Sequence, residues 1–239
     1  IINNVSINSM NLTGAIKQIT LADGREFTAT AVVLAPGGRS RTLGVTGESE
    51  FTGRGISYCA TCDGDFFTDK NIVVVGGGNS ALEEAVSLTQ YANRVTIIHQ
   101  FDHFQAFEHA IEEARSNPKI HFILESTITA FYGEEKLESI DILNLSTGVI
   151  DHYQTDGAFI FIGYVPNTEF LKGIIELNSK GEILVDADLA TSTTGVFAAG
   201  DSLSKKYRQI TTAVGDGTVA AMSAIQYIHE LKSKTTQHQ

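Results

Sequence analysis

The chain has 239 residues, 42% of them hydrophobic, and its 17 lysines and arginines against 28 aspartates and glutamates give a formal net charge of −11 at pH 7. This length and composition exclude a disordered chain, and the negative balance disfavours nucleic acid as a partner. No apolar run is close to the ~20 residues that cross a bilayer, and the first residues lack the pattern of a signal peptide, so we expect a soluble, cytoplasmic protein with no membrane partner.

The first predicted element is a hairpin over residues 14–34. Two alternating runs, 15–21 and 26–34, flank Ala22-Asp23-Gly24, whose last residues suit a tight turn. The second run ends in apolar residues and the loop Ala35-Pro36-Gly37-Gly38, which is typical of the end of a buried strand.

A strand–turn–helix–strand unit is predicted from residue 71. The apolar strand 72–75 precedes three glycines, a helix from about residue 79 to residue 91, and a second strand over 94–99. The glycines and the residues after them fit the nucleotide-binding pattern G-x-G-x-x-A, which makes candidates of Gly76, Gly78, Asn79, Ser80 and Ala81. In that pattern the glycines allow the turn and the approach of a pyrophosphate, and the small last residue allows helix and strand to pack closely. A merely tight turn is the alternative.

The rest of the chain alternates further strands with two helices. Helices are predicted over 106–116 and 211–231, with a frayed tail over 232–239. Strands are predicted over 120–130, 137–145, 149–154, 157–162 and 182–185. A buried strand from Gly195 ends in Gly200-Asp201, where an aspartate could accept hydrogen bonds from the sugar hydroxyls of a nucleotide; without context, a turn carboxylate is the simpler interpretation.

The two cysteines, Cys59 and Cys62, lie in the segment Cys59-Ala60-Thr61-Cys62-Asp63-Gly64. Thiols at this spacing can close and reopen a small ring, and Asp63 can exchange the proton that thiolate chemistry requires. A metal site and an inert bridge are the alternatives. Zinc needs four ligands, and His99, His103 and His109 do not follow at the spacing of a zinc finger, so we expect no metal.

These three motifs, in this order, resemble those of the low-molecular-weight thioredoxin reductases, flavoproteins of the pyridine nucleotide-disulfide oxidoreductase class. The likeness extends along almost the whole chain, and the segments that carry it are 59–67, 76–85, 163–168, 195–201 and 207–213. The resemblance implies an α/β fold with two Rossmann-like dinucleotide-binding domains in three layers. The flavin domain would comprise residues 1–43 and 163–239, and the domain of the dithiol and the pyridine nucleotide would comprise residues 44–162.

The resemblance also implies roles for individual residues. Cys62 would lie nearest the flavin, Cys59 would complete the pair and Asp63 would be the acid/base. Arg41 would lie where such enzymes meet thioredoxin, the segments 38–43 and 163–166 would be hinges, and the protein would be a homodimer. The residues that would contact FAD are Gly37, Gly200, Asp201, Arg208, Gln209 and Ile210.

One departure from the family concerns the start of the flavin domain. Family members begin with a βαβ unit that bears G-x-G-x-x-G for the FAD pyrophosphate, and this chain starts after it. We therefore expect a fragment or a part of a longer protein, which alone would bind FAD poorly.

A second departure concerns the electron donor. The family usually shows His-Arg-Arg-x-x-x-Arg after the second strand of the inner domain, and these arginines bind the 2′-phosphate of NADPH. Here the segment is His99-Gln100-Phe101-Asp102-His103-Phe104-Gln105, with all three arginines replaced. NADPH should bind weakly, and no acidic residue that distinguishes an NAD enzyme takes their place.

The leading hypothesis is a flavin-dependent reductase that passes electrons through Cys59 and Cys62 to thioredoxin, with ferredoxin or another donor in place of NADPH. An ordinary NAD(P)H-dependent thioredoxin reductase is the first alternative, and a catalytically inactive nucleotide-binding fragment is the second. If ferredoxin is the donor, its acidic surface needs a basic face. The candidates for that face are Lys205, Lys206 and Arg208, or Arg39, Arg41 and Arg54.

Overall fold

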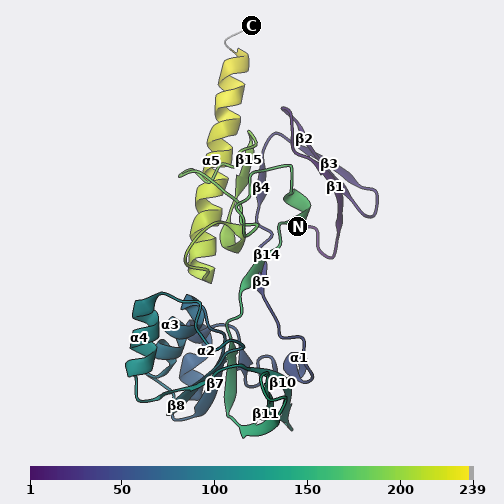
Figure 1. The fold of residues 1–239 in the computed structure, drawn as a ribbon. Helices are drawn as coiled ribbons and strands as arrows, with labels where there is room; N and C mark the ends of the chain where they lie inside the picture. Colours follow the sequence, from purple (N-terminus) through teal and green to yellow (C-terminus); the bar gives the residue numbers. More distant parts are fainter. Residues whose placement is uncertain (237–239) are drawn as a thin grey trace. The chain divides into compact units, whose positions relative to one another are not determined.

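The computed structural model describes residues 1–236, which fold as two compact units of mixed α/β structure (Figure 1). Unit 1 contains Ile1–Arg39 and the chain from Tyr164 onward, and unit 2 contains Ser40–Gly163. These divisions lie within four residues of the expected boundaries at residues 43/44 and 162/163. The assignment of one nucleotide to each unit stays a prediction.

Unit 2 is built on a five-stranded parallel sheet in the order β6-β13-β7-β8-β9. Its central strands are continuous apolar runs because both faces of the sheet are covered. Along β7, Ile72 and Val74 pack against one hydrophobic cluster, whereas Val73 and Val75 pack against another. The strands are β6 (Ile56–Ser57), β7 (Asn71–Val75), β8 (Arg94–Ile98), β9 (Ile120–Ile123) and β13 (Gly157–Ile160).

Two helices, α3 (Asn79–Leu88) and α4 (Glu108–Ser116), cover one face of this sheet (Figure 1). Ala81, Ala85 and Leu88 of α3 are fully buried against it, as their spacing predicts. The α-helix ends at Leu88 instead of residue 91, because the chain tightens there into i→i−3 turns, in which the N–H groups of Gln90 and Tyr91 donate to the carbonyl oxygens of Ser87 and Leu88.

A three-stranded antiparallel sheet covers the other face and completes the three layers. It consists of β10 (Ser126–Gly133), β11 (Leu137–Asn144) and β12 (Ile150–Gln154). The prediction of one strand over 120–130 is wrong: β9 and β10 are separate. Glu125 between them adopts a left-handed conformation, with φ at 50°, which breaks the extended chain.

Unit 1 begins with an antiparallel sheet of β1 (Ile7–Asn11), β2 (Lys17–Leu21) and β3 (Glu26–Ala29). The predicted hairpin corresponds to β2 and β3, but the single strand over 26–34 is wrong. Its apolar end forms a separate strand, β4 (Val32–Leu34), which pairs in parallel with β15 (Val196–Ala198).

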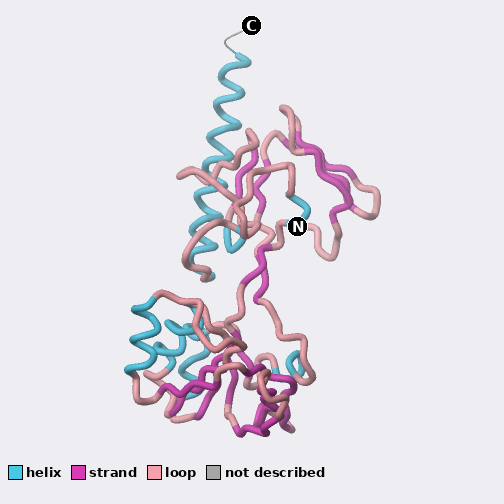
Figure 2. The backbone as a smooth tube through the Cα atoms, viewed as in Figure 1, coloured by secondary structure: helices cyan, strands magenta, loops and turns pink. Residues whose placement is uncertain are grey.

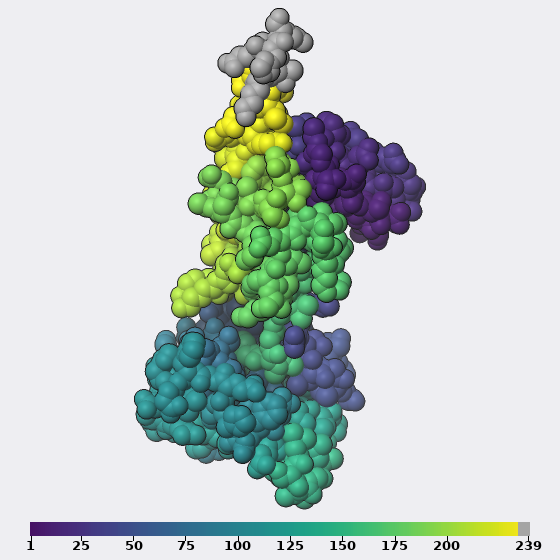
Figure 3. Space-filling view, turned by 45° about the horizontal axis from the view of Figure 1, so that its top comes forward, coloured from purple at the N-terminus to yellow at the C-terminus, as the bar shows by residue number. Residues whose placement is uncertain are grey.

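The long helix α5 (Ile210–Thr236) packs against β15 and β4. It starts one residue before the predicted helix and continues through Thr236, so the predicted end at residue 231 is wrong. The fraying of the tail stays a prediction, and residues 237–239 lie outside the described part. Much of this helix lies at the surface of unit 1, as the yellow-green and yellow atoms in Figure 3 show. Ile210, Val214 and Met222 are among its exposed apolar side chains.

The strand predicted over 182–185 is also wrong. Ile183 is fully buried and forms isolated bridges to Leu177 and Leu203, but its neighbours do not extend either pairing. The apolar run therefore reflects one fully buried residue, Ile183, followed by the half-buried Leu184 and Val185, and not a paired strand.

The remaining elements are short and lie largely in loops (Figure 2). Two segments that join the units, β5 (Gly38–Ser40) and β14 (Tyr164–Pro166), pair with each other. The short helices are α1 (Glu48–Phe51), α2 (Ala60–Asp63) and the 3₁₀ turns Gly64–Phe67, Glu169–Leu171 and Gly200–Ser202. None of these was predicted, because they are too short to show a periodic pattern.

Candidate active site

Cys59 and Cys62 form a disulfide at the start of α2 in unit 2. Cys59 precedes the helix, and its Sγ accepts a hydrogen bond of 3.2 Å from the backbone N–H of Cys62. Cys62 is an exposed residue and Cys59 is half-buried, so the pair lies at the surface of unit 2 and not in its core. Within residues 1–236 no cluster of three metal-ligating side chains occurs.

Asp63 is held in place beside this pair by Ser57. The hydroxyl of Ser57 donates to Oδ2 of Asp63 at 2.6 Å and accepts from the N–H of Cys59 at 3.0 Å. Ser57 is 5% exposed at the end of β6. Ser57 was not among the predicted site residues; the feature of the sequence that pointed to it is its place two residues before the first cysteine.

The glycine turn between β7 and α3 has the geometry that its motif requires. Gly76 has a φ of 141°, and a side chain there would lie 2.4 Å from the carbonyl oxygen of Phe161. The small side chain of Ala81 packs directly against Gly76. Gly78 caps α3, Ser80 is exposed, and Oδ1 of Asn79 accepts a hydrogen bond from the N–H of Phe107.

The segment that lacks the three arginines lies on this turn. A side chain on Gly77 would meet the ring of His99 at 2.3 Å, and the N–H of Gln105 donates to the carbonyl oxygen of Gly77 at 2.8 Å. His99 is 6% exposed, stacks with Phe104 and contacts the edge of Phe101. Its Nε2 has no partner in the described part of the chain, and burial lowers the pKa of the imidazole.

In unit 1, Gly200 and Asp201 follow β15, as predicted. The N–H of Gly200 donates to Oδ2 of Asp216, which also accepts from Lys205 at 2.5 Å. Oδ1 of Asp201 is buried and has no hydrogen-bond partner among residues 1–236. A buried carboxylate oxygen without a donor is costly, so this atom is suited to a ligand that brings a hydroxyl group.

Arg208 stands beside Asp201. Its Nε donates to the backbone oxygen of Asp201 at 3.1 Å, another of its nitrogens is hydrogen-bonded to Glu182, and its guanidinium lies 4.6 Å from the ring centre of Tyr164. Burial raises the pKa of Tyr164, and its hydroxyl is a second buried polar atom without a partner in the described chain.

Residues 3–217 match the family described as pyridine nucleotide-disulphide oxidoreductase. The chain belongs to that family. It is 43% identical over 228 residues to a thioredoxin reductase of Peptoclostridium acidaminophilum, covering 93% of this chain and 72% of the relative, and 42% identical over 225 residues to that of Mycolicibacterium smegmatis, covering 94% and 72%. The solved thioredoxin reductase of Streptococcus pyogenes superposes with a TM-score of 0.89 at 39% identity, covering 95% of this chain and 74% of that one.

The oxidoreductase family membership confirms the predicted resemblance and the fold of Rossmann-like domains. The chain is a thioredoxin reductase-like flavoprotein oxidoreductase with a cysteine pair, and its family uses FAD. None of the helices within residues 1–236 combines the length and the apolar character needed to cross a bilayer.

The FAD contacts expected from this oxidoreductase family all lie in unit 1. Asp201 and Arg208 are in contact, whereas Gly37 lies in the loop before β5 and has open space where a side chain would be. Gln209 is half-buried at the start of α5, and the side chain of Ile210 is 84% exposed. The two unpartnered oxygens, Oδ1 of Asp201 and the hydroxyl of Tyr164, fit the hydroxyl and phosphate groups of FAD as hydrogen-bond partners.

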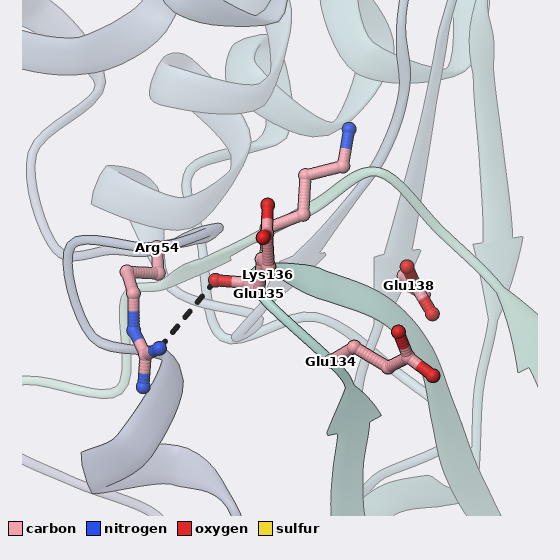
Figure 4. A pocket seen from close by; sticks show the side chains of 5 residues that line it. All are labelled: Arg54, Glu134, Glu135, Lys136 and Glu138. Carbon is pink, nitrogen blue, oxygen red and sulfur yellow. Dashed lines mark hydrogen bonds between the residues drawn. The ribbon is translucent and has the colours of Figure 1, made fainter.

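A surface cavity of about 380 Å³ lies in unit 2 (Figure 4), and of the residues predicted from the sequence it includes Arg54, a candidate for the basic face. It is lined by Arg54, Glu134, Glu135, Lys136 and Glu138. Arg54 donates across it to the carbonyl oxygen of Glu135, and three carboxylates share the space. None of the cysteine-pair, glycine-turn or flavin-site residues lines this cavity.

Proposed function

We propose that this protein passes electrons through Cys59 and Cys62 to the disulfide of thioredoxin. The observation that carries the proposal is the partly exposed disulfide beside a carboxylate that Ser57 orients. When bound, FAD supplies the electron pair that opens the Cys59–Cys62 bond. Asp63 is assigned the proton exchange with the cysteine sulfurs, because it directly follows Cys62 and its carboxylate is held by Ser57.

The exchange with substrate balances as two thiolate attacks. One cysteine thiolate attacks a sulfur of the thioredoxin disulfide, which forms a mixed disulfide and releases one thioredoxin thiolate. The second cysteine thiolate then attacks the mixed disulfide, restores the Cys59–Cys62 bond and releases the other thioredoxin thiolate. Two electrons and two protons reach thioredoxin in each cycle.

The flavin site is assigned to unit 1. Asp201 offers its unpartnered Oδ1 to a hydroxyl group of the cofactor, and Arg208 fixes the backbone of Asp201 from the face of Tyr164. The remaining assigned contacts, which rest on the family resemblance, are Gly37, Gly200, Gln209 and Ile210.

We assign the donor site to the glycine turn of unit 2 and propose that NADPH is a poor donor. Gln100, Phe101 and Gln105 stand where the family has arginines, and His99, which matches the family's histidine, lies over Gly77. Each charged hydrogen bond to a phosphate is worth about 1.5 to 3 kcal/mol, so three losses weaken NADPH binding strongly. Ferredoxin or another donor without a 2′-phosphate takes its place.

An ordinary NAD(P)H-dependent reductase is the alternative, and the intact turn at Gly76, Gly78, Asn79, Ser80 and Ala81 favours it. Anaerobic stopped-flow reduction of the FAD-loaded protein by NADPH, NADH and ferredoxin, followed by addition of thioredoxin, separates the two. Rapid flavin reduction by micromolar NADPH with turnover of thioredoxin would overturn the donor assignment. Absence of bound flavin or of titratable thiols would instead indicate an inactive nucleotide-binding fragment.

The partner assignments rest on the same family resemblance. We place thioredoxin near Arg41 and expect a homodimer, which light scattering on the purified protein tests. If ferredoxin is the donor, we expect its docking face at one of two basic groups, and charge reversal at the exposed Lys206 of the first or the exposed Arg54 of the second distinguishes them. The first group is Lys205, Lys206 and Arg208, and the second is Arg39, Arg41 and Arg54.

A further inference from the structure

Glu48, the first residue of α1, is a buried carboxylate in unit 2. Its side chain is 3% exposed, and no ion pair within the described residues includes it. Its charge is stabilised by three hydrogen-bond donors instead. The N–H of Leu43 donates to Oε1 at 2.9 Å, and the N–H of Gly44 donates to Oε2 at 2.6 Å.

The third donor is the hydroxyl of Tyr58, 2.9 Å from Oε1 of Glu48. Tyr58 directly precedes Cys59 in the chain. Burial and the bond to Glu48 raise the pKa of this phenol to about 12, so the hydroxyl remains protonated and able to donate at physiological pH. Glu48 therefore connects the segment at Leu43 and Gly44 to the residue that leads into the disulfide.

Ser57 and Tyr58, the two residues before Cys59, thus both restrain its backbone. The hydroxyl of Ser57 accepts its N–H, and the side chain of Tyr58 is held by a carboxylate that is itself bound to two backbone amides. Leu43 and Tyr58 also pack against the same hydrophobic cluster of unit 2.

We infer that Glu48, acting through Tyr58, is a positioning residue for the redox-active cysteine pair. This inference rests on the proposed function for its biological meaning, but not for its test. The anchored backbone holds Cys59 near Cys62, which raises the effective concentration of each thiol toward the other. The contact therefore favours the disulfide over the dithiol.

The test compares Tyr58→Phe and Glu48→Gln with the wild type and with a matched control, Tyr132→Phe. Tyr132 also donates its hydroxyl to a carboxylate, Oδ2 of Asp141 at 2.7 Å, on the three-stranded sheet. The dithiol-to-disulfide ratio is measured by alkylation and mass spectrometry after equilibration in dithiothreitol redox buffers, without donor or thioredoxin. We expect Tyr58→Phe to raise this ratio about threefold or more, the change that loss of one hydrogen bond allows, and Tyr132→Phe to leave it unchanged.

A ratio unchanged in Tyr58→Phe would overturn the inference, and so would an equal change in Tyr132→Phe. A role confined to stability would lower the melting temperature of the oxidised and reduced forms equally and leave the ratio unaltered. If Glu48→Gln does not fold, Tyr58→Phe decides alone, because it keeps the ring. Since neither flavin nor thioredoxin enters this measurement, its failure is distinct from a failure of the proposed function, which thioredoxin turnover reports.

Discussion

Ser57 and Asp63 are joined by a hydrogen bond of 2.6 Å, and the same serine oxygen accepts the N–H of Cys59. A hydroxyl has one proton to donate, so the bond to Asp63 commits it and leaves the lone pairs for the backbone amide. The carboxylate and the first cysteine are therefore held by one buried atom at the end of β6.

Replacing Ser57 by alanine should release Asp63 and leave the N–H of Cys59 without its partner. We expect the rate of thioredoxin reduction to fall about tenfold, because the acid/base group loses its orientation. Stability should fall by about 1 to 3 kcal/mol, as for other buried polar groups that lose a partner.

The matched control is Ser126→Ala. Ser126 is also buried in unit 2 and donates its hydroxyl to the carbonyl oxygen of Leu124. Urea unfolding should show a similar loss of stability for both variants, with thioredoxin reduction impaired only in Ser57→Ala. Equal activity in the two variants would count against the role given to Ser57.

Arg208→Lys should weaken FAD binding about tenfold or more. Lysine keeps the charge but cannot bond Glu182 and the backbone of Asp201 together while it lies flat on Tyr164. Fluorescence titration with FAD measures the effect. Arg25→Lys, at an exposed pair with Asp23, is the control and should bind flavin as the wild type does; undiminished binding by Arg208→Lys would exclude Arg208 from the site.

Substitution of arginine for Gln100, Phe101 and Gln105, as in the family pattern, should make NADPH an efficient electron donor. We expect the catalytic efficiency with NADPH to rise about a hundredfold or more, since each charged hydrogen bond to the phosphate adds about 1.5 to 3 kcal/mol. NADH is the internal control, because it lacks the 2′-phosphate and should gain little. A parallel rise with both nucleotides would mean that the arginines do not act through that phosphate.

His99 should make unit 2 less stable in acid. Its folded-state pKa is lowered by burial, so the unfolded chain takes up a proton at a higher pH than the folded chain does. The stabilising contribution of the neutral ring is complete above the unfolded pKa, about 6.5, and is lost as the pH falls through the folded value. His99→Phe should therefore lose less unfolding free energy than the wild type between about pH 7.5 and about pH 5 in urea titrations; parallel losses would contradict this assignment.

The strongly patterned parts of the fold were predictable. The apolar strand β7, the glycine turn and the buried face of α3 follow from residue types within a short stretch of sequence. The division between β3 and β4 was not predictable, because β4 owes its existence to its pairing with β15, more than a hundred and fifty residues away.

The residues of the candidate site were likewise predictable only in part. Cys59, Cys62 and Asp63 were identifiable from their spacing, whereas the role of Glu48 was not. Its three donors include two backbone amides, which carry no signal in the sequence, and a tyrosine ten residues further on. The position of His99 over Gly77 likewise depends on how the chain after β8 folds back on the turn.

The most direct test of the central claim is a single-turnover transfer from the FAD-loaded, fully reduced protein to thioredoxin disulfide, quenched with an alkylating reagent and analysed by mass spectrometry. We predict that alkylation of Cys59 and Cys62 decreases as alkylation of the thioredoxin cysteines increases, with one thioredoxin dithiol formed for each Cys59–Cys62 disulfide. Cys59→Ser and Cys62→Ser should each abolish the transfer. Reduction of thioredoxin at the wild-type rate by the doubly substituted protein, or a cysteine pair that stays labelled beside oxidised thioredoxin, would contradict it.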